Sequence, residues 1–261
     1  MGAPRGIIAS MVLDADIPSV TGVLRYVPLF AGLTTEQLHS VAGLAEARRL
    51  KAKQSFLRQG SSADVIYVVL GGQIRVSEIT SDGHEIIYRF IGPGQMIGGM
   101  AAVGGMTYPI NAQAVRESSL LAWRTDAIQR LMRQHPEIAL NAMRLMVQRI
   151  EELQRRCLEL ATEQVRQRVA HTILRLIGQH GRRVARGVLL DLRLSRQDLA
   201  KMAGTTLYTA SRLLNIWKRR KIIAFDTGRI LILRPHELVR LADGPTPEEV
   251  PPASNDLAAP V

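Results

Sequence analysis

Residues 195–220, SRQDLAKMAGTTLYTASRLLNIWKRR, decide how this 261-residue chain is interpreted. They predict two short amphipathic helices joined by a tight turn at Gly204. Ser195 is the expected N-cap of the first helix, and Asp198 completes a capping box with it. Apolar residues recur at helical spacing in both helices. These residues are Leu199, Met202 and Ala203 in the first helix and Ala210, Leu213, Leu214 and Trp217 in the second.

Polar side chains and one arginine in the turn and the first half of the second helix point away from this apolar face. They are Thr205, Thr206, Tyr208, Thr209, Ser211 and Arg212. Two such helices are typical of a DNA-reading helix-turn-helix, in which one helix braces the fold and the other enters a groove. A packed helical hairpin without a DNA-binding role is the alternative interpretation, and the charge around the motif argues against it.

The positive charge of the chain is concentrated around this motif. The net charge is +11, and residues 163–241 contain 17 Lys and Arg against 5 Asp and Glu, while the remainder has 17 against 18. A basic segment of this kind attracts polyanions by releasing their counterions, so its binding depends strongly on salt. The expected partner is therefore double-stranded DNA.

Several other classes of protein are excluded by the sequence. The single cysteine, Cys157, rules out a disulfide framework within the chain and an iron–sulfur cluster held by four of its own cysteines. No apolar run is long enough to span a bilayer and no signal peptide is evident, so we expect a cytoplasmic protein without a membrane role. The motifs of hydrolases, metalloproteases and P-loop enzymes are missing, so neither an enzyme nor a metal site is expected.

The pattern along the chain predicts an α+β protein with five parts. Short β-rich runs separated by turn signals at residues 71–72, 82–83 and 92–94 predict an N-terminal antiparallel barrel or roll. A long helix follows, and the segment 222–233 reads as the hairpin, or wing, of a winged helix. The expected parts are a disordered leader (1–22), the roll with flanking helices (23–134), the long helix (135–162), the winged helix-turn-helix (163–241) and a disordered tail (242–261).

Within the long helix, apolar residues alternate at steps of three and four. This seam consists of Met143, Met146, Ile150, Leu153, Cys157 and Leu160. Its spacing is that of a coiled coil. The roll could cover it within one chain, but we favour a parallel homodimer because a two-fold DNA reader needs a two-fold axis. Cys157 would then be either a small buried hydrophobe, which we favour, or one half of an inter-chain disulfide.

The order of these elements resembles the cyclic-AMP receptor protein/fumarate-nitrate regulator (Crp/Fnr) superfamily of bacterial transcription factors. Four segments carry the resemblance: VPLFAGLTTEQL, FLRQGSSADVIYVVLGGQIRV, DGHEIIYRFIGPGQMIGGM and LSRQDLAKMAGTTLYTASRLL. The resemblance implies an N-terminal sensory β-roll, a long dimerisation helix and a C-terminal winged helix. It also implies a palindromic promoter site and a contact with RNA polymerase.

The resemblance assigns roles to residues of the helix-turn-helix. Ser195, Arg196 and Gln197 match the phosphate-contacting start of the first helix, and Arg212 matches an arginine that reads a guanine edge. Leu207 and Tyr208 stand where the family often has Arg and Glu. The operator is therefore expected to keep the guanine opposite Arg212 and to differ nearby.

The sensor departs further from the family pattern. Gly98-Gly99 replaces the Gly-Glu pair that holds a cyclic nucleotide's ribose, Pro109-Ile110 replaces the Arg-Ser or Arg-Thr pair that holds its phosphate, and Leu153-Gln154 replaces a polar pair on the long helix. An unneutralised phosphate in a partly buried pocket is costly, so cyclic AMP and cyclic GMP are not the expected effectors. The candidate effector pocket consists of Gly98, Gly99, Met100, Pro109, Ile110, Asn111 and Leu153.

This pocket segment is rich in Gly, Ala and Met and nearly uncharged. It is either a packed roll without a ligand or an apolar cavity for haem or another hydrophobic effector. GTTLYTASR also resembles the nitrite and nitric-oxide reductase regulators, which implies a nitrogen-oxide response, but none of the six histidines stands out as an axial ligand. A different interpretation, a regulatory module of cyclic-nucleotide type that acts through a protein partner, is disfavoured by the basic segment.

Overall fold

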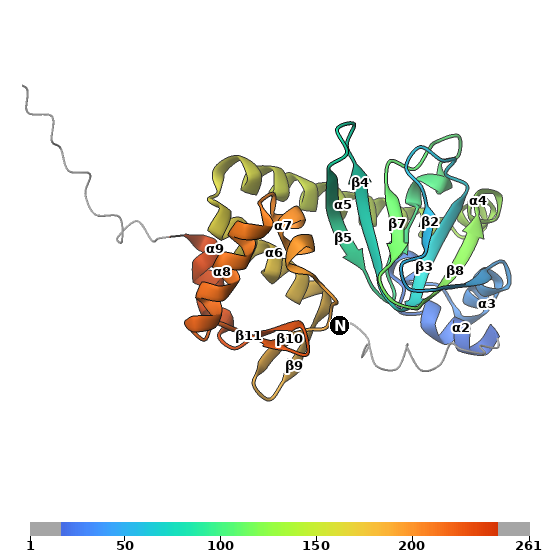
Figure 1. Ribbon diagram of the computed structural model, residues 1–261. Helices are drawn as coiled ribbons and strands as arrows, with labels where there is room; N and C mark the ends of the chain where they lie inside the picture. The colour runs from blue at the N-terminus through green and yellow to red at the C-terminus, as the bar shows by residue number, and fades with distance from the viewer. Residues whose placement is uncertain (1–16, 245–261) are drawn as a thin grey trace, which may run out of the picture. The chain divides into compact units, whose positions relative to one another are not determined.

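The structure is a computed structural model that describes residues 17–244. The predicted leader and tail lie outside the described residues for 1–16 and 245–261. The chain divides into two compact units, residues 1–158 and 159–261, and each is described by itself (Figure 1). The break falls inside the long helix, four residues before the expected end of that helix at 162.

Helices flank the sheets of the first unit. They are α2 (Ile17–Leu24), the short 3-10 helix η1 (Pro28–Phe30), α3 (Thr35–Gly43), the 3-10 helix η2 (Gly99–Ala102), α4 (Thr125–Gln134) and α5 (Pro136–Thr162), whose last turn belongs to the second unit. Helix α2 begins inside the predicted leader, because Val20, Val23 and Leu24 are buried against the core. The expectation of disorder is therefore wrong from residue 17 onward.

The first unit contains the predicted antiparallel roll. Its strands are β1 (Glu46–Leu50), β2 (Ser55–Leu57), β3 (Val65–Gly71), β4 (Ile74–Ile79), β5 (Glu85–Ile91), β6 (Met96–Ile97), β7 (Asn111–Ala114) and β8 (Ser118–Arg124). They form two four-stranded sheets, ordered β1-β8-β3-β6 and β2-β7-β4-β5, in which every pairing is antiparallel. Strands β4 and β5 form a hairpin, and β5 is the edge strand of its sheet.

A single buried tryptophan ties the helices of the first unit to the roll. Trp123 on β8 donates from Nε1 to the backbone oxygen of Val41 on α3 at 2.9 Å. Its ring also packs against Phe30, with 5.4 Å between centroids. Because a buried indole N–H needs an acceptor, this bond fixes where α3 docks.

The second unit is a winged helix-turn-helix, as predicted. Its helices are α6 (Val165–His180), α7 (Arg196–Ala203), α8 (Leu207–Arg219) and α9 (Pro235–Asp243). Its strands are β9 (Gly181–Val184), β10 (Gly187–Leu190), β11 (Ile223–Asp226) and β12 (Arg229–Ile232), in the order β11-β12-β10-β9. The predicted wing is the β11–β12 hairpin, whereas β9 and β10 were not expected from the sequence.

The local signals of the helix-turn-helix have their expected structural form. Asp198 N donates to Ser195 Oγ at 3.0 Å, and Ser195 N donates to Asp198 Oδ2 at 3.0 Å, which is a complete capping box. Gly204 ends α7 in the left-handed conformation at φ 60°. The apolar faces of α7 and α8 meet in a core around Leu199, Leu214 and Trp217.

Candidate nucleic-acid interface and sensor

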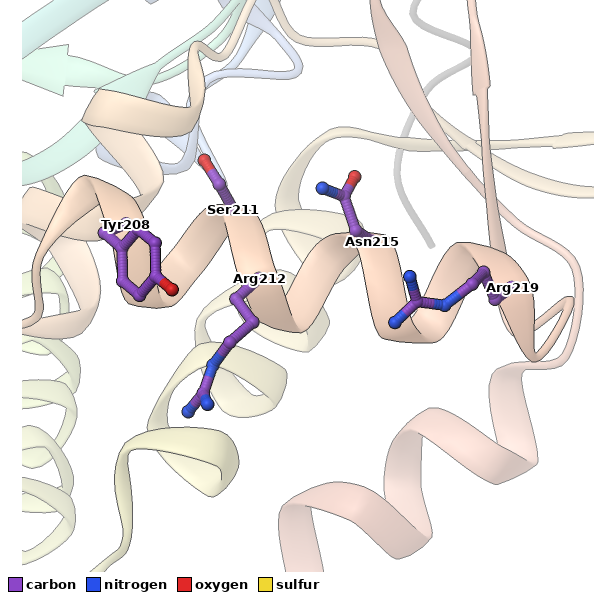
Figure 2. A pocket seen from close by; sticks show the side chains of 5 residues that line it. All are labelled: Tyr208, Ser211, Arg212, Asn215 and Arg219. Carbon is purple, nitrogen blue, oxygen red and sulfur yellow. The ribbon is translucent and has the colours of Figure 1, made fainter.

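One side of α8 presents a continuous row of polar and basic side chains. Tyr208, Ser211, Arg212, Asn215 and Arg219 line a shallow pocket along this helix, and Figure 2 shows them in sequence along it. We call these five residues the reading face. Tyr208 is the most open of the described large apolar or aromatic side chains, with 78% of its surface exposed.

Two members of the reading face were missed by the sequence analysis. Asn215 and Arg219 lie one and two turns beyond Ser211 and Arg212 on the same side of α8. The spacing of three to four residues that singled out Arg212 could have found them if it had been followed to the end of the helix. Both carry groups that hydrogen-bond to bases or phosphates.

The threonines before and within the first turn of α8 serve the helix itself. Thr206 is the N-cap, and its Oγ1 accepts from Thr209 N at 3.2 Å and lies 3.0 Å from Thr209 Oγ1. Thr205 donates its backbone N–H to Ala200. Leu207 is exposed at the start of the helix. Of these four predicted contact residues, Thr206 and Leu207 are exposed, whereas Thr205 and Thr209 are half-buried.

Arg196 connects three elements of the second unit. Its guanidinium lies 5.2 Å from the centre of the Phe225 ring on β11, and Nη2 is 3.4 Å from Asn215 Oδ1 on α8. Ser195 is engaged in the capping box, and Gln197 is exposed beside them. Arg196 therefore contacts both the wing and α8 and remains close to the surface, where it can also contact phosphate.

Arg168 on α6 fixes the turn of the helix-turn-helix. Its guanidinium donates to three backbone oxygens, those of Glu163 at 2.7 Å, Ala203 at 3.1 Å and Gly204 at 3.2 Å. The oxygens of Ala203 and Gly204 lie at the C-terminal end of α7, where a cation is favourable. This one side chain holds the entry to α6 and the end of α7 in a fixed relation.

A second polar network joins the last turn of α5 to α6. Arg175 binds both carboxylate oxygens of Glu159 at 2.5 Å, and His171 Nδ1 lies 3.0 Å from Glu163 Oε2. The ligand atoms of Glu159, Glu163 and His171 lie within 4.8 Å of one another. Since Arg175 occupies both oxygens of Glu159, we interpret the group as an ion-pair network.

The predicted seam on α5 is exposed to solvent in the single chain. Met143, Met146, Ile150, Leu153 and Leu160 are between 39% and 60% exposed, and the Cys157 thiol is also exposed. Leu140 and Val147 extend the stripe and, with Met143, Arg144 and Gln148, line a groove. So much uncovered apolar surface on one helix marks an interaction surface.

The predicted effector pocket is partly filled by Tyr108. A Cβ on Gly98 would lie 2.7 Å from the Val65 oxygen and 3.3 Å from the Tyr108 ring, so the glycine permits a close packing there. The Tyr108 hydroxyl donates to Val65 O at 2.5 Å and accepts from Val65 N at 3.1 Å. Burial is the main cause that raises the pKa of Tyr108.

The other predicted pocket residues differ in their exposure and in the elements that carry them. Gly99 and Met100 lie in η2, Pro109 is exposed, and Ile110 packs against the core of the roll. Asn111 on β7 is bonded to Gln59, since its Oδ1 accepts from Gln59 N at 3.1 Å. Leu153 belongs to the exposed stripe of α5. The shared effector pocket therefore stays a prediction.

The histidines of the first unit do not fit an axial ligand of haem inside the roll. Among its described residues, His39 and His84 are exposed, and His135 Nδ1 lies 3.4 Å from Gln37 Nε2 between helices. Haem as a cofactor therefore stays a prediction.

Comparison with known proteins is consistent with both units. A family model for the cyclic nucleotide-binding domain matches residues 47–135, and one for the Crp-like helix-turn-helix domain matches residues 167–241. The nitrogen fixation regulation protein FixK of Rhizobium meliloti is 30% identical over 194 residues, which are 74% of this chain and 85% of that protein. The chain belongs to the Crp/Fnr superfamily of transcription regulators.

Other members are similar at greater distance. The cyclic AMP receptor protein of Thermus thermophilus is 27% identical and covers 83% of this chain and 97% of its own length. The structure of FixK2 from Bradyrhizobium japonicum has a TM-score of 0.68 at 20% identity, with 77% of this chain and 99% of that chain covered, which shows the shared fold. As a Crp/Fnr regulator, the chain is a DNA-binding transcription factor and not an enzyme. None of its described helices is both long and apolar enough to cross a membrane.

Proposed function

We propose that this Crp/Fnr regulator binds a palindromic promoter site as a homodimer, with one α8 helix in the major groove of each half-site. The reading face carries this proposal, because its five polar and basic side chains project from a helix whose opposite face is buried. Half-sites about one helical turn of DNA apart would place both helices on one side of the duplex.

The dimer would form through the exposed apolar stripe of α5. Pairing two copies of α5 in parallel buries Met143, Met146, Ile150 and Leu153 against their counterparts, which removes the largest uncovered apolar surface of this helix. Cys157 would lie near its own copy. Dimerisation in this way supplies the two-fold axis that a palindromic site requires.

Base recognition would centre on Arg212. A bidentate contact from its guanidinium to the O6 and N7 atoms of guanine discriminates by about 1–3 kcal/mol. Leu207 offers an apolar contact to a thymine methyl, and Tyr208 can bond to a phosphate or a base edge. Asn215 adds a side chain that suits adenine.

The test compares Arg212→Ala with Arg196→Ala on a panel of operators that differ by one base pair. Arg212→Ala should lose about 1–3 kcal/mol and relax specificity at one base pair, whereas Arg196→Ala should weaken binding to all sequences about equally. Titrations of labelled duplexes at fixed salt give both quantities. If Arg212→Ala keeps the wild-type sequence preference, the docking of α8 is wrong.

We further propose that the roll controls DNA binding and that its effector is not a cyclic nucleotide. Tyr108 fills the space beside Gly98, and Pro109 and Ile110 supply no cation for a cyclic phosphate. An effector would shift the chain between two arrangements of α5 and so re-aim the two reading faces of the dimer. The DNA-bound dimer would contact RNA polymerase at the promoter. Visible spectra after haem reconstitution test the nitrogen-oxide hypothesis, since a Soret band shifted by nitric oxide would support it and a bare spectrum would exclude it.

A further inference from the structure

The first unit contains a cationic side chain with one shielded nitrogen that has no hydrogen-bond partner among the described residues. Arg89 lies on the edge strand β5, is half-buried, and has its Nε atom shielded from solvent with no acceptor among the described residues. Burying part of a guanidinium without an acceptor is costly, because the lost hydration is not replaced. A position of this kind in a sensory domain calls for a functional explanation.

The surroundings of Arg89 are more positive than negative. Burial lowers its pKa first, the positive charge of Arg149 on α5 lowers it further, and Glu152 on α5 opposes both. Arg149 itself pairs with Glu152 at 2.6 Å, and both side chains of that pair are about three-quarters buried. The carboxylate of Glu152 therefore offsets the positive charge of both Arg89 and Arg149.

A third arginine joins the same group. Arg156, two turns after Arg149 on α5, donates from Nη1 to the backbone oxygen of Tyr88 on β5 at 2.8 Å. Burial raises the pKa of Glu152, but the hydrogen bond from Arg149 and the charges of Arg149, Arg89 and Arg156 outweigh it and hold the pKa below its usual range. The Tyr88 hydroxyl donates a hydrogen bond to the carboxylate of Glu78, so it is not part of this group of arginines. We call Arg89, Arg149 and Arg156 the arginine cluster.

We propose that the arginine cluster is a binding site for a small oxyanion, a carboxylate or phosphate group, which sits between β5 and α5 and hydrogen-bonds to Arg89. Arg149 pairs with the carboxylate of Glu152 at 2.6 Å, the positive charges of Arg89 and Arg156 act on the same carboxylate, and Arg89 is the member that still has a shielded donor to offer. Guanidinium groups bind the planar or tetrahedral oxygens of such anions in a fork that an ammonium group cannot reproduce.

The position of the cluster gives its occupant a regulatory consequence. The anion would bridge the edge strand of the roll to α5, where Arg156 already makes one backbone link. This consequence rests on the proposed function, in which α5 transmits the signal. Binding of the anion does not depend on the proposed function, because it can be measured without DNA. Failure of anion binding and failure of the proposed function are therefore distinguishable. The site also differs from the apolar pocket that the sequence predicted, because its charged residues come from β5 and α5.

The test is thermal unfolding of the full chain in inorganic phosphate and in succinate, with chloride at the same ionic strength as the reference. Trp217→Phe provides the background, since Trp123 then reports on the first unit alone. Phosphate, succinate or both should raise the melting temperature, because a ligand that binds only the folded state stabilises it. A response to phosphate alone indicates a phosphate ester as effector, and a response to succinate alone indicates a dicarboxylate.

Two variants separate this site from other anion-binding surfaces. Arg89→Met should abolish the anion response and, in chloride, should leave the melting temperature unchanged or raised, since an unpaired buried charge is removed. Arg212→Met, on the reading face, should keep the full response. The proposal is overturned if neither anion stabilises the parent protein, if Arg89→Met retains the response, or if Arg212→Met loses it.

Discussion

The reading face and the arginine cluster are both cationic, but they are built in opposite ways. The reading face comes from consecutive turns of one helix, and most of its side chains are exposed. The arginine cluster joins β5 to α5 across 60 residues of sequence and is largely shielded. A charge in water costs little and needs no partner, whereas a shielded charge needs one. The reading face can therefore be predicted from a local sequence pattern, whereas the arginine cluster can be found only from the fold.

The two tryptophans provide the strongest test of how separate the two regions are. Trp123 and Trp217 are each buried in one unit, with 0% and 1% of their surface exposed. Trp217→Ala should destabilise the second unit by about 3–5 kcal/mol because it leaves a large cavity. Specific DNA binding should fall with it. The remaining Trp123 fluorescence then reports whether the first unit still unfolds at its original denaturant concentration.

The reciprocal substitution completes this experiment. Trp123→Ala should destabilise the first unit by a similar amount, and it also leaves the Val41 oxygen without its indole donor. The single Phe variants give the reference curves. One shared unfolding transition in both Ala variants would show that the two units unfold together. It would contradict the view that the second unit, which reads DNA, is stable independently of the first unit.

A smaller loss of stability is expected from a substitution at Gly187. This residue begins strand β10 of the β9–β10 hairpin, which was not expected from the sequence. Gly187 has φ 144°, and a Cβ there would lie 2.0 Å from the backbone oxygen of Ile232 on β12. Gly187→Ala should cost the second unit roughly 2–4 kcal/mol through strain and displacement of β12. Gly228→Ala in the wing is the matched control, because its added methyl meets no atom within 4 Å and carries only the cost of φ 78°. Urea unfolding followed by Trp217 should rank the two variants in that order, and equal losses would refute the steric argument.

Arg168 tests whether the reading face depends on a residue that is not part of it. Arg168→Met removes the donors to Glu163, Ala203 and Gly204 and should cost about 1.5–3 kcal/mol, the range for hydrogen bonds from a charged group. DNA affinity should fall for all operators alike, since no base contact is lost. Arg186→Met, an exposed arginine in the β9–β10 turn, controls for the lost charge in the unfolding measurement. A changed base preference in Arg168→Met would instead place this residue among the readers.

How far the sequence predicted the structure follows the same contrast. The helix-turn-helix was predicted with its capping box, its turn at Gly204 and its buried Leu214 and Trp217, because each signal lies within a few residues. The β9–β10 hairpin was not, since GRRVARG has neither alternating hydrophobicity nor a standard hairpin turn. Strand β9 pairs with β10, and β10 is held in turn by β12, which lies more than 40 residues further along the chain.

The sensor shows the limit most clearly. The family pattern directed attention to Gly98, Pro109 and Leu153, but Leu153 is exposed and Tyr108 fills the space beside Gly98. The local sequence around Arg89, EIIYRFI, reads as an ordinary strand. That Arg89 meets Arg149 and Glu152 depends on which face of α5 lies against β5, and no spacing within either segment encodes it.

The smallest predicted effect concerns the acid stability of the first unit. Because the pKa of Glu152 is held below its ordinary value of 4.5, its ionised form stabilises the folded state. That contribution is complete above the ordinary pKa and is lost as the pH falls through the lower folded value. Glu152→Gln should therefore flatten the decline in stability on acidification, measured by urea unfolding in the Trp217→Phe background. Glu151→Gln, an exposed neighbour on the same helix, should leave the decline as it is. If both variants decline like the parent, Glu152 does not neutralise the arginine cluster, and the charge balance assigned to the sensor must be revised.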